Sequence, residues 1–150
     1  MCFIMKNNKM TIQEKEQEVI ERYADIDDWM DRYACIIDAG NELPELPESL
    51  RTPDRLIEGC QSRVWLDAEQ DADGNVIYRA DSDAIIVKGI ISMLVEVLSG
   101  HTPDEILDAK LDFIHAIGLD EHLSPTRSNG LVAMVKQMRA YAAAFKAKGN

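Results

Sequence analysis

The chain has 150 residues and a mass of 16.9 kDa, and its 27 acidic against 16 basic residues give a formal net charge of −11. This length predicts one domain with a sizeable core, and the acidic excess argues against nucleic acid and anionic membranes as default partners. Three cysteines do not make a disulfide framework and suit a reducing compartment, where each is either a core residue or a reactive thiol.

Residues 1–10 are expected to form a disordered leader ahead of a single domain over residues 11–150. The short apolar stretch at the start precedes its lysines, whereas a secretory signal needs a longer apolar region that follows positive charge. The most apolar segment, residues 84–98, contains Lys88 and Glu96 and is too short to span a bilayer. We therefore expect a cytoplasmic protein.

Helical patterns dominate the first forty residues. Residues 11–23 form an amphipathic pattern, and residues 25–39 carry a second apolar stripe at helical spacing, which Gly40 is placed to end. The two prolines of residues 43–50 favour extended conformations in the residues before them, so this segment is predicted to be an ordered, extended connector.

The middle of the chain changes to a two-residue period. Apolar and polar side chains alternate over residues 62–68 and again over residues 76–80, and the turn at residues 71–75 contains an Asp-Gly pair that suits a tight hairpin. An antiparallel hairpin is predicted, with the stretch before Cys60 as a candidate third strand.

Helices resume after the hairpin. Ser82 or a neighbouring aspartate can cap a buried central helix over residues 84–98, which Gly100 ends. Residues 102–105 (TPDE) combine a capping threonine, a proline and a glutamate at a helix start. Residues 124–125 (SP) likewise place a capping residue and a proline before the last helix. The order of elements predicts an α+β fold, with a small antiparallel sheet of about three strands packed by N-terminal and C-terminal helices.

Charge is distributed unevenly along this order. Residues 11–50 carry 12 acidic residues against three basic ones, whereas residues 131–150 carry four basic residues and no acidic one. Two solvated helix faces of opposite sign explain this pattern, and a docking role for the acidic face is a possibility that charge alone does not support.

Cys60 is the cysteine whose surroundings point to chemistry. Gly59 gives the backbone the freedom to expose or swing the thiol, and Arg51, Arg55 and Arg63 lie close in sequence. A nearby cation favours the thiolate, which is the nucleophilic form. A small buried strand residue explains the same position, and spacing alone does not decide between the two.

The start of the last helix breaks two local preferences. A helix N-terminus favours acidic residues, yet the charged residue here is Arg127, and Gly130 inside the helix costs about 1 kcal/mol relative to alanine. Backbone approach, anion binding or a partner surface would explain both choices. A structural ion pair from Arg127 to Glu58 or Asp83 is the alternative.

Other candidates are weaker. Cys35 lies beside an apolar helical stripe and is predicted to fill the core, while Cys2 belongs to the leader. The three histidines form no metal-ligand spacing with any cysteine, and no phosphate-binding loop or hydrolase motif is present. A cysteine–histidine catalytic pair has no specific support.

Several co-linear motifs together resemble the SufE family, whose members accept sulfur from cysteine desulfurases during iron–sulfur cluster assembly. The resemblance covers residues 14–146 and rests on the segments 43–47 (LPELP), 59–66 (GCQSRVWL), 81–84 (DSDA), 88–89 (KG), 99–103 (SGHTP) and 122–131 (HLSPTRSNGL). Several motifs in order are more specific than any one of them.

The resemblance implies that Cys60 is the persulfide acceptor. As a thiolate it would attack the terminal sulfur of a desulfurase persulfide, stimulate that enzyme and pass the sulfur to a cluster-assembly scaffold. Residues that would position the loop or bind the partner are Gly59, Gln61, Ser62, Asp83, Arg127, Asn129 and Gly130. In the family the free protein shelters this loop, so Cys60 would turn inward and flip out on docking.

The implied partners are a SufS-type cysteine desulfurase, which holds the pyridoxal phosphate, and a SufBCD-type scaffold. No cofactor, metal or enzymatic activity is expected in this chain, which would be a monomer or a weak dimer. A paralogous acceptor for a different desulfurase is a close alternative. An iron–sulfur scaffold would need several converging cysteines, and a cysteine hydrolase would need a base and an oxyanion motif that the sequence lacks.

Overall fold

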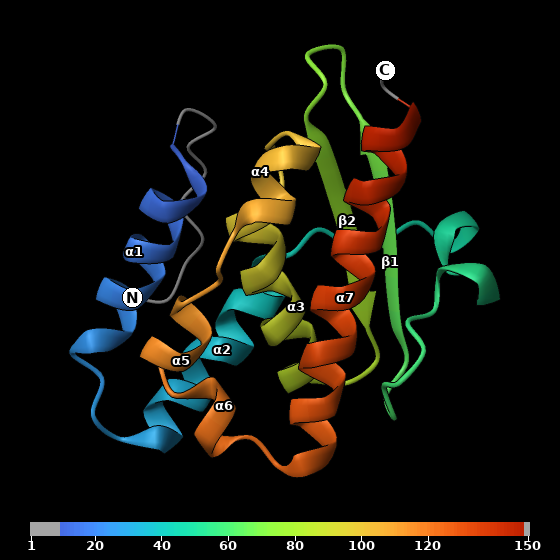
Figure 1. Ribbon diagram of the computed structural model, residues 1–150. Helices are drawn as coiled ribbons and strands as arrows, with labels where there is room; N and C mark the ends of the chain where they lie inside the picture. Colours follow the sequence, from blue (N-terminus) through green and yellow to red (C-terminus); the bar gives the residue numbers. More distant parts are fainter. Residues whose placement is uncertain (1–9, 149–150) are drawn as a thin grey trace.

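The computed structural model describes residues 10–148, and its helices pack around one central helix (Figure 1). The predicted leader, with Cys2, lies outside the described residues except for Met10. In chain order the elements are α1 (Ile12–Ala24), α2 (Trp29–Glu42), short 3-10 turns at Glu48–Leu50 and Pro53–Arg55, β1 (Val64–Gln70), β2 (Val76–Ser82), α3 (Ile85–Leu98), α4 (Pro103–Asp108), α5 (Phe113–Ala116), α6 (Leu119–His122) and α7 (Pro125–Lys148).

The first two helices form where the pattern places them, with one correction at each end of the second. Thr11 caps α1 through a capping box with Glu14, as its sequence favours. Asp28 caps α2 by accepting from the Met30 N–H, so this helix begins at Trp29 and not at residue 25. The predicted stop at Gly40 is wrong, because α2 continues to Glu42.

Gly40 is a packing residue, not a terminator. A Cβ atom added to Gly40 would lie 2.8 Å from the backbone nitrogen of Gly89 in α3, and one added to Gly89 would overlap the carbonyl oxygen of Ile36. The two helices therefore cross with their backbones in close approach, which only glycine permits. This contact presses α2 against the buried central helix.

The predicted hairpin is present as an antiparallel pair of strands. β1 and β2 pair in a register that sets Leu66 opposite Ala80, and the predicted Asp71–Asn75 turn joins them. Within residues 10–148 the sheet has two strands; the candidate third strand is reduced to a single bridge between Leu56 and Trp65. The chain before Cys60 forms 3-10 turns around Pro53 instead, since proline lacks the N–H that a strand ladder uses.

α3 occupies the middle of the fold. Its side chains Ile90, Ile91, Met93 and Leu94 are buried, and α2, the hairpin, α1 and α7 surround it (Figure 1). No helix in the described part of the chain is both long and apolar enough to cross a bilayer.

Two short helices, α5 and α6, were not predicted from the sequence. They lie at one end of the molecule, where the Trp29 ring of α2 stacks on the His122 ring with centroids 4.0 Å apart. The Tyr33 hydroxyl donates to the His122 carbonyl at 2.7 Å, and Arg32 Nη1 donates to the Ile117 carbonyl at 2.7 Å. These contacts fix the segment that leads into α7.

Candidate functional site

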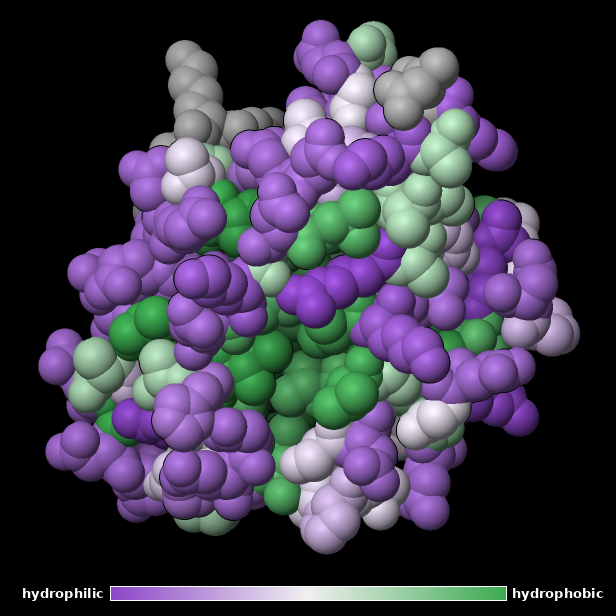
Figure 2. Space-filling model, viewed as in Figure 1, coloured by the Kyte–Doolittle hydropathy of each residue, from purple (hydrophilic) through white to green (hydrophobic). Residues whose placement is uncertain are grey.

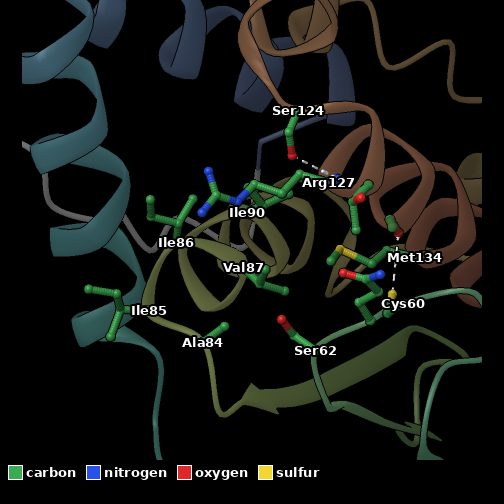
Figure 3. Close-up of a pocket in the computed structure, with 13 residues that line it drawn as sticks. Cys60, Ser62, Ala84, Ile85, Ile86, Val87, Ile90, Ser124, Arg127 and Met134 are labelled. Atoms are coloured by element: carbon green, nitrogen blue, oxygen red, sulfur yellow. Dashed lines mark hydrogen bonds between the residues drawn. The ribbon is translucent and has the colours of Figure 1, made fainter.

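Cys60 lies in the loop that enters β1, beside a pocket of about 650 Å³. The pocket opens between this loop, the N-terminal part of α3 and the first turns of α7 (Figure 3). Its walls combine a polar edge at Gln61, Ser62 and Arg127 with apolar side chains from α3 and α7. A pocket of this size and mixed lining can hold a small group next to the thiol.

The thiol is held by the backbone of α7. Cys60 Sγ is half-buried and donates to the Gly130 carbonyl at 3.6 Å, the contact drawn as a dashed line in Figure 3. A Cβ atom on Gly130 would lie 3.4 Å from that sulfur. The glycine that is unfavourable in a helix therefore leaves room for the cysteine, which accounts for the anomaly in the sequence.

Gly59 is needed for the loop that carries Cys60. Its φ of +95° lies in the left-handed region, and a Cβ there would come 3.2 Å from the Cβ of Ala133. Both the backbone angle and the contact with α7 favour glycine. The Gly-Cys pair thus sets the thiol against the helix.

The resting state of the thiol differs from the sequence expectation. Burial raises the pKa of Cys60, so the protonated thiol is the resting form. Two of the arginines expected to favour the thiolate are paired elsewhere: Arg51 with Asp81 at 2.6 Å and Arg55 with Asp67 at 2.9 Å. Closeness in sequence did not translate into closeness to the sulfur, because the 3-10 turns direct these side chains toward the hairpin.

Arg127 is exposed at the mouth of the pocket. Within the described residues it forms no ion pair, so the predicted alternative of a structural ion pair with Glu58 or Asp83 is wrong. Its backbone N–H donates to Ser124 Oγ at 3.3 Å, and its side chain extends toward Ile86 of α3 and away from Cys60 (Figure 3). An exposed, unpaired guanidinium is available to an acidic group on a partner.

A buried carboxylate braces the strand end next to the pocket. Asp81 accepts from Arg51 at 2.6 Å and from the Leu46 and Ser82 N–H groups, and it lies 3.4 Å from Lys88 Nζ. Burial alone raises the pKa of Asp81, but these hydrogen bonds and cations outweigh it and lower the pKa. Sequence reasoning did not assign this role to Asp81, because strand alternation gives no sign that a carboxylate is buried.

Asp83 has a more local role. Its Oδ1 accepts from the Arg63 N–H at 3.1 Å, which ties the start of β1 to the turn before α3. It does not line the Cys60 pocket. The contact holds together the two segments that flank the pocket.

The structure brings together five of the residues predicted for the site: Cys60, Gln61, Ser62, Arg127 and Gly130. Gly59 and Asn129 line a neighbouring cavity on another side of α7. Sequence reasoning missed the apolar wall, which includes Ala84, Ile85, Ile86, Val87, Ile90 and Met134. In the sequence they belong to apolar segments that look like ordinary core, so only the fold reveals that they face a cavity.

The other candidates lie away from this pocket. Cys35 has 1% exposure and packs in the core, where it was predicted. Among the described residues, one group of three potential metal ligands lies close together: His115, Asp120 and Glu121. That group is exposed and contains no cysteine, and Cys60 belongs to no such group.

Most of the chain matches a known family. Residues 17–142 match the family model described as SufE, Fe-S metabolism associated domain. An uncharacterized SufE-like protein of Rhizobium meliloti (strain 1021) is 40% identical over 130 residues, which cover 83% of this chain and 92% of the relative.

A solved structure shares the fold. The solution structure of a hypothetical protein from Thermus thermophilus superposes with a TM-score of 0.73, over 89% of this chain and 96% of that chain. At 21% sequence identity this likeness concerns the fold alone.

Proposed function

The chain belongs to the SufE family, and from this premise we propose that it accepts persulfide sulfur on Cys60 from a cysteine desulfurase. The observation that carries the proposal is the half-buried thiol of Cys60, set beside a pocket with an apolar wall and an unpaired arginine at its mouth. The family model associates this domain with iron–sulfur metabolism, which is the process that consumes such sulfur.

The transfer is a thiol–persulfide exchange. The Cys60 thiol loses its proton, and the thiolate attacks the terminal sulfur of the desulfurase persulfide. The S–S bond of the desulfurase persulfide breaks as a new S–S bond forms on Cys60. The desulfurase cysteine leaves as a thiolate and takes up a proton, so the step needs no external oxidant or reductant.

The raised pKa of the Cys60 thiol in the free protein suggests when this exchange takes place. Because burial raises the pKa of Cys60, the free protein holds an unreactive thiol in its pocket. A docked desulfurase would need to draw the loop outward or supply a base for the proton. After transfer, the apolar wall of α3 and α7 would shelter the terminal sulfur from reductants.

The wider role follows from this chemistry. The chain acts as a sulfur-transfer partner and activator, while the pyridoxal phosphate and the C–S bond cleavage belong to a SufS-type desulfurase. Removing the persulfide frees that enzyme for another turnover, and the sulfur then passes to a SufBCD-type scaffold. Gln61, Ser62 and Arg127 would contact the docked partner.

The proposal is tested by counting desulfurase turnovers. A pyridoxal-phosphate-loaded desulfurase from the same organism is given cysteine and a thiol reductant, with and without the full chain, and alanine is measured. We expect the chain to raise the turnover rate and Cys60→Ser to abolish the increase. An equal increase with Cys60→Ser would contradict the acceptor role.

A further inference from the structure

A second hollow lies on the other side of α7 from the Cys60 pocket, between this helix and the α5–α6 segment. Figure 2 shows apolar side chains gathered at the centre of this face. The hollow measures about 650 Å³, and its apolar lining includes Leu111, Ile114, Leu131, Val132 and Val135. Val132 is 67% exposed and is the most exposed of these apolar side chains.

Cations border this hollow. Lys110, Lys136 and Arg139 line it, and within the described residues none of the three forms an ion pair. The chain as a whole has 11 more acidic than basic residues, so intramolecular carboxylates are in excess and these cations nevertheless remain unpaired. Two acids also line the hollow, Asp112 and Asp120, and Asp120 is paired with His115 at 2.8 Å.

Arg139 carries a further signal. Its Nη2 donates to the Ala109 carbonyl at the end of α4, while its buried Nε has no acceptor in the described structure. A buried guanidinium N–H without an acceptor is costly, and a carboxylate placed near this group would compensate for part of that cost. The hollow therefore combines apolar contact area with positive charge that a bound carboxylate would stabilise.

The hollow and the Cys60 pocket are both lined by residues of the first turn of α7. Ser128 lines the hollow and Arg127, its neighbour on the first turn of α7, lines the Cys60 pocket. A stable complex covers about 800 Å² on each partner, which is more than the mouth of one small pocket provides. A protein that docks over Cys60 must therefore extend onto neighbouring surface, and this face of α7 offers the exposed Val132 side chain beside cations that form no ion pair within residues 10–148.

We propose that the hollow between α7 and α5–α6 docks an acidic segment of the desulfurase that engages Cys60, with an apolar side chain seated against Val132 and carboxylates over Lys110 and Lys136. This inference rests on the proposed sulfur-acceptor function. A second copy of the chain fits the hollow poorly. A two-fold interface would set like cations against each other, and a head-to-tail contact would extend into open chains unless its rotation closed a ring.

The test measures affinity for the pyridoxal-phosphate-loaded desulfurase by isothermal titration calorimetry. The exposed residues Lys110 and Lys136 are changed together to Glu, and Val132→Glu is made separately. We expect the Kd to rise about tenfold or more in each case, since like charges across an interface are strongly unfavourable. The Kd of the parent chain should also rise with NaCl more steeply than that of the double variant.

The control is Lys148→Glu, which makes one such Lys-to-Glu change at the far end of α7, half the charge change of the double variant. Its Kd should stay within about twofold of the parent value, and thermal melting of every variant verifies the fold. Equal Kd values for the control and the double variant would overturn the proposal, as would a parent chain that does not bind. Light scattering that shows a parent dimer dissociated by Val132→Glu would assign the hollow to a second copy instead.

Failure of this inference is separable from failure of the proposed function. Intact-mass measurement of the parent chain in the same mixtures reports sulfur uptake independently of affinity. Sulfur uptake together with unchanged Kd values in the hollow variants rejects the docking surface alone. No sulfur uptake together with weakened binding of those variants rejects the acceptor role and retains the docking surface.

Discussion

At the scale of single residues, the sulfur of Cys60 is controlled by its immediate neighbours. Gly59 supplies the left-handed backbone, Gly130 leaves the space and the carbonyl that the thiol contacts, and burial keeps the thiol protonated. The sequence indicated Gly130 as an anomaly and Gly59 as the source of backbone freedom beside the cysteine. It could not indicate the direction of the pKa change, which depends on where the arginine side chains point.

The raised pKa predicts slow alkylation of Cys60 in the free protein. Burial favours the thiol, so at any pH below the raised pKa the thiolate fraction of Cys60 is smaller in the native protein than in the unfolded chain. The two thiolate fractions become similar as the pH rises through that pKa. Iodoacetamide labelling of the Cys60 peptide, followed by mass spectrometry from pH 6 to 10, measures this. Equal rates in native protein and in urea at pH 7 would contradict the account.

Arg127 is predicted to act in docking and not in stability. It is exposed and unpaired in the described structure, so Arg127→Ala should change the free energy of unfolding by less than about 0.5 kcal/mol. The same variant should weaken binding to the desulfurase, as measured by calorimetry. A large loss of stability with unchanged binding would instead assign Arg127 a structural role.

At the scale of elements, the contact between α2 and α3 positions one wall of the site. Gly40 and Gly89 let the two helix backbones approach closely, which sets the start of α3 beside the Cys60 loop. The apolar wall of the pocket therefore depends on a packing contact on the other side of the same helix.

Gly89→Ala should be strongly destabilising for this reason. The added Cβ would overlap the Ile36 carbonyl oxygen, so the helices must move apart, at a cost of about 1–3 kcal/mol or more. Met30→Ala at a 74% exposed position of α2 is the control and should be nearly neutral. Urea unfolding measures both, and a loss below about 0.5 kcal/mol for Gly89→Ala would show that the contact is looser than described.

Sequence patterns predicted elements whose signals are local. The capping box at Thr102, the hairpin turn and the buried helix α3 appeared where expected, because caps, turns and periodicity act over a few residues. Gly40 was misread as a stop, since a glycine at a close helix contact looks the same in one sequence as a glycine at a helix end. The helices α5 and α6 are too short to produce a periodic signal, and contacts such as the Trp29–His122 stack stabilise them.

At the scale of the whole molecule, ion pairs leave the net charge of −11 unchanged, because each pair is neutral. Arg22 and Glu96 pair at 2.6 Å between α1 and α3 with nearly buried side chains, yet the first third of the chain keeps a large acidic excess. The sequence showed this excess, and it placed Lys136 and Arg139 in a basic C-terminal segment. Only the fold brings Lys110 to the same hollow as these two cations.

Self-repulsion of the acidic excess predicts that moderate salt stabilises the protein. Raising ionic strength from about 0.01 M to about 0.15 M shortens the screening length from about 30 Å to about 8 Å and weakens this repulsion. The Tm should rise by about 2 °C or more, since 1 kcal/mol corresponds to about 2–4 °C in a domain of this size. A falling Tm in NaCl would mean that attractive surface pairs such as Lys146–Asp104 outweigh the repulsion.

In the proposed function, Cys60 receives sulfur directly from a desulfurase persulfide. The most direct test is intact-mass and peptide mass spectrometry of the full chain after incubation with the pyridoxal-phosphate-loaded desulfurase and cysteine, without added reductant. We expect one added sulfur atom on the peptide that contains Cys60, and none in Cys60→Ser. An unmodified Cys60 beside a desulfurase that turns over cysteine would contradict it.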